Sequence, residues 1–262
     1  MTGATARSAG PLPPVRRAAA PATRVLAQAR FEAGTLLRNG EQLLVALLLP
    51  ALALAALVLG HVPSLGAGRR VDVAVPGVLA LAVLSTAFTG QAIATGFDRR
   101  YGVLRLLGVS PLGRAGLLLA KAVAVLAVEL LQAVVIGALG LALGWHPKWV
   151  GLLPGVLAGV LGTWGFVALA LLLAGSVRAE GVLALANLLW VLLLGLGGVV
   201  IPAGQLPGGV AQLARWLPSG ALGDALRAAF LHGRAAGIPL LVLALWAAAA
   251  TALTARTFRW DG

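Results

Sequence analysis

From Trp149 to Val177 the chain runs for 29 residues without an acidic or basic side chain. A helix rises about 1.5 Å per residue and the hydrocarbon core of a bilayer is about 30 Å thick, so about 20 apolar residues cross it. Over the whole chain 60% of the residues are hydrophobic and 11% are charged, whereas soluble domains carry about 25% charged residues. The sequence therefore predicts an integral membrane protein.

Six charge-poor windows of this kind follow one another along the chain. A single segment in lipid must satisfy its own backbone hydrogen bonds, which favours helices. The windows are apolar on every face, so they lack the short alternating pattern of a membrane β-barrel. We predict an all-α protein with six transmembrane helices. The predicted spans are about 42–60, 75–97, 122–144, 150–175, 181–201 and 236–256.

The segment before the first span divides into two parts. Residues 1–21 are rich in Pro, Ala and Arg, a composition that predicts a disordered basic tail. In residues 22–40, apolar side chains recur at helical spacing among arginines. This pattern predicts an amphipathic helix that lies on the membrane interface, and a solvated helical lead-in is the alternative. Residues 22–262 are then one transmembrane domain.

The distribution of Lys and Arg predicts the orientation. With the N-terminus in the cytoplasm, fourteen of these residues lie in inside segments and six in outside segments. Cytoplasmic loops carry the excess of Lys and Arg, so we predict that both termini are cytoplasmic. The net charge of +12 thus belongs to the membrane surface, and we predict no nucleic-acid partner. Because arginine far outnumbers lysine, we expect a bacterial chain in the plasma membrane.

The predicted cytoplasmic loop 98–121 has a distinctive order of residues. An acidic-basic cluster leads through a glycine to a short Leu-rich helix and then a Ser-Pro pair. We predict that Ser110 caps the next helix with Pro111 at its first position, and that Leu104 and Leu107 share a docking face for a cytoplasmic partner. An ordinary positively charged connector is the alternative. The candidate residues are Asp98, Arg99, Arg100, Gly102, Leu104, Arg105, Leu106, Leu107, Ser110 and Pro111.

A second segment, between spans five and six, is broken by prolines and by Gly208-Gly209. Proline interrupts a continuous helix, yet the segment is too apolar for an exposed loop. We therefore predict a re-entrant or interfacial pair of short helices there.

Taken together, the two segments resemble the ABC-2 family, the membrane subunits of type-2 ATP-binding-cassette exporters. The matching features are Asp98-Arg99-Arg100, Gly102, Leu104 to Leu107, Ser110-Pro111, Lys121 and the Pro-broken return after span five. Asp98 stands where the family more often has Glu, and Val103 where Thr is often found. The resemblance implies a permease subunit of an exporter. It also implies a homodimer, or a heterodimer with a related permease, and separate cytoplasmic ATPase subunits that bind ATP and Mg.

The sequence has no Cys and none of the usual catalytic motifs. Without a G-x-x-x-x-G-K-[ST] loop or an H-E-x-x-H helix, we expect this chain to bind neither nucleotide nor metal itself. We therefore predict a transport subunit that is not an enzyme. One alternative is a membrane scaffold or assembly protein, and another is a lipid-modifying enzyme, which would need converging Asp, Glu, His or Ser residues.

Polar residues inside the predicted spans are candidates for the translocation path. Glu129 is the one ionisable residue within a span, and such residues are functional candidates by default. Its alternative role is structural, as an ion pair with a neighbour such as Arg178 or as a hydrogen bond between helices. The candidate path residues are Glu129, Gln132, Gln91 and Asn187. The sequence leaves the identity of the substrate open.

Overall fold

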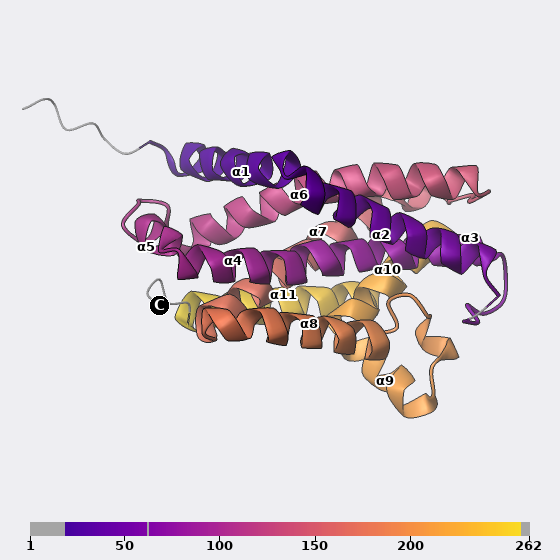
Figure 1. Cartoon of the computed structure of the whole chain (residues 1–262). Coiled ribbons are helices and arrows are strands. Elements are labelled where there is room, and N and C mark those ends of the chain that lie inside the picture. The colour runs from indigo at the N-terminus through magenta and orange to yellow at the C-terminus, as the bar shows by residue number, and fades with distance from the viewer. Residues whose placement is uncertain (1–18, 62, 258–262) are drawn as a thin grey trace, which may run out of the picture.

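The computed structural model describes residues 19–61 and 63–257, and these residues form helices joined by short connections (Figure 1). No strand occurs in these ranges, which confirms the predicted all-α class. Residues 1–18 of the predicted tail lie outside the described residues. The elements are α1 Pro21–Arg38, α2 Gly40–Leu59, α3 Arg70–Val83, η1 Leu84–Gly90, α4 Gln91–Arg100, α5 Val103–Gly108, α6 Gly113–Ala142, η2 Trp149–Gly151, α7 Leu152–Ser176, α8 Ala179–Leu196, η3 Ala203–Gln205, α9 Gly208–Trp216, α10 Pro218–His232 and α11 Gly237–Thr257.

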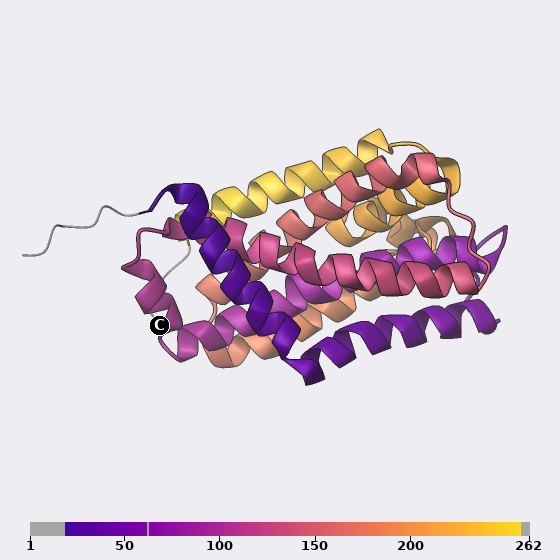
Figure 2. The same cartoon turned by 90° about the horizontal axis from the view of Figure 1, so that it is seen from above.

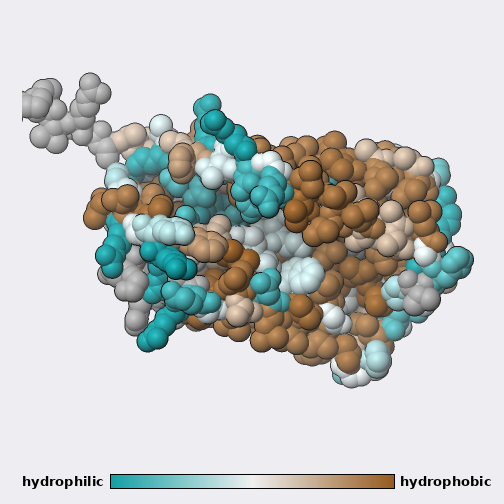
Figure 3. All heavy atoms as spheres, viewed as in Figure 1, coloured by the Kyte–Doolittle hydropathy of each residue, from teal (hydrophilic) through white to brown (hydrophobic). Residues whose placement is uncertain are grey.

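Five helices are long and apolar enough to cross a bilayer. They run lengthwise through the molecule in both views (Figures 1 and 2). In Figure 3, apolar atoms cover much of the middle of the viewed face and polar atoms gather toward both ends. These helices correspond to five of the six predicted spans. They are Gly40–Leu59, Arg70–Arg100, Gly113–Ala142, Trp149–Ser176 and Gly237–Thr257.

The predicted span 181–201 is shorter in the structure, because α8 ends at Leu196. The next turn contains Gly198, whose φ of +65° is left-handed and does not continue a helix. At Gly197 the backbone approaches α10 so closely that a Cβ atom would lie 2.0 Å from the Ser219 hydroxyl oxygen. The apolar helix Glu180–Leu196 is therefore shorter than the other five, and helix length alone supports five spans.

The central element is the continuous helix Arg70–Arg100, which joins α3, η1 and α4. It is the most buried of the five long helices. Its middle turns, η1, are π-helical, a local widening that frequently accompanies functional sites. Phe88 of η1 packs against Phe166 of α7 with ring centroids 6.5 Å apart. This helix therefore supplies both the core of the bundle and the wall of the cavity described below.

The predicted pair of short helices after α8 is present as α9 and α10. Helix α10 is mostly buried, and it contains Arg227, which is 7% exposed. Arg227 is one of the six Lys and Arg residues that the sequence-based count assigned to outside segments, but it lies within a helix and its side chain is buried. Its guanidinium donates to the carbonyl oxygens of Gly198, Val199 and Val200, just after α8. Burial lowers the pKa of Arg227 and raises that of its neighbour Asp224.

The N-terminal helix α1 crosses the bundle obliquely (Figure 2) and packs against α6. It covers Pro21–Arg38, close to the predicted 22–40. Asn39 separates it from α2, and the Asn39 side chain accepts a hydrogen bond from the Gln42 backbone N–H at 3.2 Å. This is an N-cap, which fixes where the first long helix begins. The location of α1 at the membrane interface stays a prediction.

Candidate functional site

The loop between α4 and α6 contains the predicted short helix, α5. Gly102 precedes it with a left-handed φ of +77° that turns the chain. The prediction that Ser110 caps the following helix is wrong. Its hydroxyl donates to the Leu107 carbonyl at 2.6 Å and accepts from the Leu112 N–H at 3.4 Å. Helix α6 begins only at Gly113, whose φ of +70° is left-handed, and no side chain caps it. Ser110 therefore closes the end of α5, and Pro111 lies in the turn.

The exposed face of α5 differs from the predicted one. Leu104 is fully buried and belongs to the same core cluster as Leu117 and Leu118 of α6. It therefore does not form a docking face, because α5 turns this side toward the bundle. Leu106 is 72% exposed and the neighbouring Val109 is 86% exposed. The apolar surface that α5 offers to a partner is centred on these two residues.

A buried ion cluster anchors the start of this loop. The side chain of Lys121, in α6, is 0% exposed, and its amino group lies 3.2 Å from a carboxylate oxygen of Asp98 at the end of α4. The same amino group lies 3.0 Å from a carboxylate oxygen of Glu32 in α1. The cluster joins three helices that are distant in sequence. Sequence reasoning found Asp98 and Lys121 but missed Glu32, for which no local spacing gave a signal.

Two arginines connect the α4–α6 loop to α7 and α1. Arg99 donates to the carbonyl oxygens of Ala174 and Val177 at 3.1 and 2.9 Å, and so binds the C-terminal end of α7. A cation there complements the helix dipole. Arg24 of α1 donates to the Pro111 carbonyl oxygen. The loop is thus tied by side-chain contacts to α1, α6 and α7.

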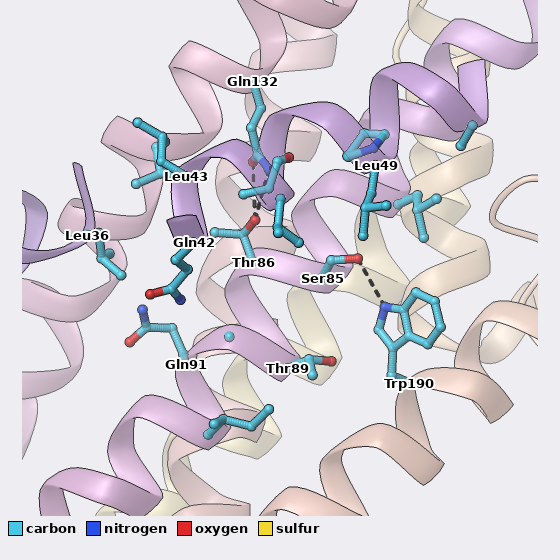
Figure 4. Close-up of a pocket in the computed structure, with 18 residues that line it drawn as sticks. Leu36, Gln42, Leu43, Leu49, Ser85, Thr86, Thr89, Gln91, Gln132 and Trp190 are labelled. Carbon is cyan, nitrogen blue, oxygen red and sulfur yellow. Dashed lines mark hydrogen bonds between the residues drawn. The ribbon is translucent and has the colours of Figure 1, made fainter. Parts of the chain in front are cut away.

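A cavity of about 420 Å³ is lined by residues of α1, α2, α3, η1, α4, α6 and α8 (Figure 4). The structure brings two of the candidate path residues, Gln91 and Gln132, together in its wall. All polar side chains in the wall are amides, hydroxyls or the Trp190 indole, and none is ionisable. The lining residues are Leu36, Gln42, Leu43, Val45, Ala46, Leu49, Pro50, Ala53, Leu81, Ser85, Thr86, Thr89, Gly90, Gln91, Ile93, Val128, Gln132 and Trp190.

Some of these polar groups are already paired and others are free. Gln132 exchanges hydrogen bonds with Thr86 and donates to the Ala46 carbonyl at 2.9 Å. Figure 4 shows this contact and the bond from the Trp190 indole N–H to Ser85. Among the described residues, the Thr89 hydroxyl and the Gln91 side-chain oxygen are buried without a partner. Buried polar atoms normally find partners, so these two are available to a molecule inside the cavity.

The other two candidate path residues lie outside this cavity. Glu129 is buried between α6 and α7, where one carboxylate oxygen accepts from the Thr163 hydroxyl and the other has no partner among the described residues. Its suggested pairing with Arg178 is wrong, because Arg178 lies beside α5 at the end of the bundle. Asn187 is exposed and bonds the Leu183 carbonyl of its own helix at 3.0 Å.

The described part of the chain holds no group of three or more His, Cys, Asp or Glu side chains that could bind a metal ion. The Lys121 cluster contains two carboxylates, but its centre is already filled by the lysine amino group.

The long apolar helices and the polar ends of the bundle define a multi-pass helical membrane protein. A family model described as ABC-2 family transporter protein matches residues 69–256, which is more than half of the chain. The chain belongs to this family of ABC transporter permeases, as the sequence resemblance predicted. The matched region begins just before α3, so α1 and α2 lie outside it. No curated protein matches the sequence.

Proposed function

We propose that this chain is the permease subunit of an ATP-driven exporter in a bacterial plasma membrane. The family match over residues 69–256 carries this proposal. The chain contributes half of a translocation path, and separate cytoplasmic subunits bind ATP with Mg and hydrolyse it. The role of this chain is to convert the movement of those subunits into opening and closing of the path.

Helix α5 is the proposed docking element for the ATPase. Its outer surface exposes the apolar side chains of Leu106 and Val109, next to Tyr101 and Arg105. Exposed apolar groups beyond the membrane core favour contact with a protein partner. The ties of the loop to α1, α6 and α7 support the same role, because a rigidly anchored helix passes a push on to the bundle.

The proposed orientation places α5 in the cytoplasm. Arg114 at the start of α6 donates to the Ala255 carbonyl near the end of α11 at 2.8 Å, so the start of α1 and the end of α11 both lie at the α5 end. When the buried Lys121 and Arg227 are left out, thirteen Lys and Arg residues lie in the predicted inside segments and five in the outside segments, instead of fourteen and six. A reporter fused after Gly262 should report the cytoplasm, and one inserted near Gly66 the outside. The opposite result would overturn the orientation.

Helix α8 is the proposed sixth span. Its 18 residues rise about 27 Å, which is close to the thickness of the hydrocarbon core. An even number of spans returns both termini to one side. The cavity lies between α2 and α8, both of which expose large apolar side chains. We propose that a second permease, identical or related, covers this face and completes the path.

The docking proposal is tested with Leu106→Asp in the chain co-expressed with its ATPase. An aspartate buried at the interface loses its hydration, so we expect the variant to insert but to bind the ATPase about tenfold more weakly or worse. The matched control is Val150→Asp, because Val150 is 78% exposed at the other end of the bundle. Co-purification and stimulated ATP hydrolysis are the measurements.

Full ATPase binding by Leu106→Asp would show that α5 is only a connector. A chain that binds no ATPase at all, and whose vesicles show no ATP-dependent efflux, would favour the scaffold alternative over the exporter.

A further inference from the structure

A second hollow, of about 580 Å³, lies at the α5 end of the bundle, where the α4–α5 turn meets the α7–α8 connection. Four arginines and one glutamate line it, which leaves an excess of three positive charges. In this it differs from the cavity beside η1, whose lining holds no charged residue. The lining residues are Arg99, Arg100, Tyr101, Gly102, Arg105, Arg178 and Glu180.

The fold brings these arginines together from three parts of the chain: the end of α4, α5, and the connection between α7 and α8. The left-handed turn at Gly102 sets Arg105 of α5 beside the end of α4, and Arg178 stands at the N-cap position of α8. Arg99 is fixed by the α7 carbonyls. Within the described residues, Arg100, Arg105 and Arg178 form no ion pair with a carboxylate. Three guanidinium groups are therefore free to bind an anion.

The depth of this hollow is set by the central helix. Its 31 residues, Arg70–Arg100, rise about 45 Å, which is close to the thickness of about 40–45 Å of a bilayer including both headgroup layers. The hollow, at the end of that helix, therefore lies at the level of the lipid phosphates. Phe97 and Tyr101 stack at 6.2 Å beside it and are both exposed. Tyrosine is enriched at the membrane–water interface, where its ring lies at the level of the headgroups.

We propose that this hollow binds a phosphate group, presented by the headgroup of a phospholipid in the leaflet at the α5 end. The planar guanidinium forms paired hydrogen bonds with phosphate oxygens, and the start of α8 adds the positive end of a helix dipole. A phosphate held here bridges α5 to the α7–α8 connection. The proposal does not depend on the direction of transport or on the ATPase.

Tyr101 allows a site-specific test, because it is the sole tyrosine of the sequence. The full chain is labelled with 3-fluorotyrosine and placed in nanodiscs of a galactolipid, which contains no phosphate. Phosphatidylglycerol is then titrated into the nanodiscs, and inorganic phosphate or glycerophosphate is added to separate samples. We expect a saturable shift of the single fluorine resonance with phosphatidylglycerol.

The variant Arg105→Gln/Arg178→Gln should bind the lipid about thirtyfold more weakly, because each arginine near the membrane surface contributes about fivefold. The matched control Arg30→Gln/Arg38→Gln removes the same charge from exposed positions on α1 and should keep the saturable shift. A response to the soluble phosphates as well would show that the site binds phosphate from either source. No response to any phosphate source would overturn the proposal. Equal loss in both double variants would also overturn it, because the effect would then be general surface charge.

Discussion

Two buried cations, one beside the end of α4 and one beside the turn after α8, are stabilised in different ways. Lys121 contacts the carboxylates of Glu32 and Asp98, which belong to α1 and α4. Arg227 contacts the backbone carbonyls after α8, with Asp224 one turn away on its own helix at 3.3 Å. Lys121 joins separate helices through ion pairs, whereas Arg227 donates hydrogen bonds to the carbonyl oxygens of the turn that follows α8.

The two kinds of contact reflect different structural requirements at the two ends of the bundle. At the α5 end, three helices that meet at an angle must stay together, and opposite charges supply an attraction that acts across helix boundaries. At the other end, the chain after α8 is not helical, so the carbonyl groups of Gly198, Val199 and Val200 have no helical N–H as a partner. A buried carbonyl without a donor is costly, and the forked guanidinium of Arg227 can reach several of them at once.

The largest effect on stability should come from Lys121→Met. It leaves two neighbouring carboxylates without their cation, and removal of one partner of a buried pair costs about 3–5 kcal/mol. Glu32 and Asp98 keep side-chain exposures of 15% and 31%, so we expect the lower end of that range. Thermal unfolding in detergent measures the loss. Adding Glu32→Gln and Asp98→Asn should restore most of it, and an unchanged melting temperature in Lys121→Met would contradict the role of the cluster.

A smaller loss is expected for Arg227→Leu, about 2 kcal/mol, because the carbonyls after α8 lose a charged donor. Arg227→Lys keeps the charge but not the fork and should lose about half as much. The same thermal assay compares both variants with the Lys121 series. If Arg227→Lys were as stable as the original chain, the charge alone would hold this end and the contrast with Lys121 would disappear.

The smallest loss of stability, about 1 kcal/mol or less, is expected for Gln132→Leu, because the hydrogen bonds of Gln132 involve no charged group. Gln132→Leu removes a polar group from the cavity wall, so it should change substrate-stimulated ATP hydrolysis of the assembled transporter. Glu129→Gln is the matched control on the same helix. It keeps an acceptor oxygen for Thr163 and lies outside the cavity, so it should leave that activity unchanged. The reverse pattern would place the path along Glu129.

Much of the fold was predictable because it depends on local composition. Long apolar windows specify helices in lipid, and the glycine, Leu-rich and Ser-Pro order of the loop was enough to predict α5 and the family. The predicted end of span five was wrong by several residues. A window without charges continues through Gly197 and Gly198, but the helix ends there because α10 packs against those glycines.

The sequence by itself determined the all-helical membrane class, five of the spans and the family to which the chain belongs. Only the tertiary structure decided which side chains face inward: Leu104 rather than Leu106 in α5, and Gln132 rather than Glu129 at the cavity. It also decided that Lys121 and Arg227 are buried charges. In an apolar sequence every helix face is hydrophobic, so the periodicity of apolar residues cannot distinguish a face that contacts lipid from one that packs in the protein core. That distinction depends on contacts between residues such as Glu32 and Lys121, which are far apart in the chain.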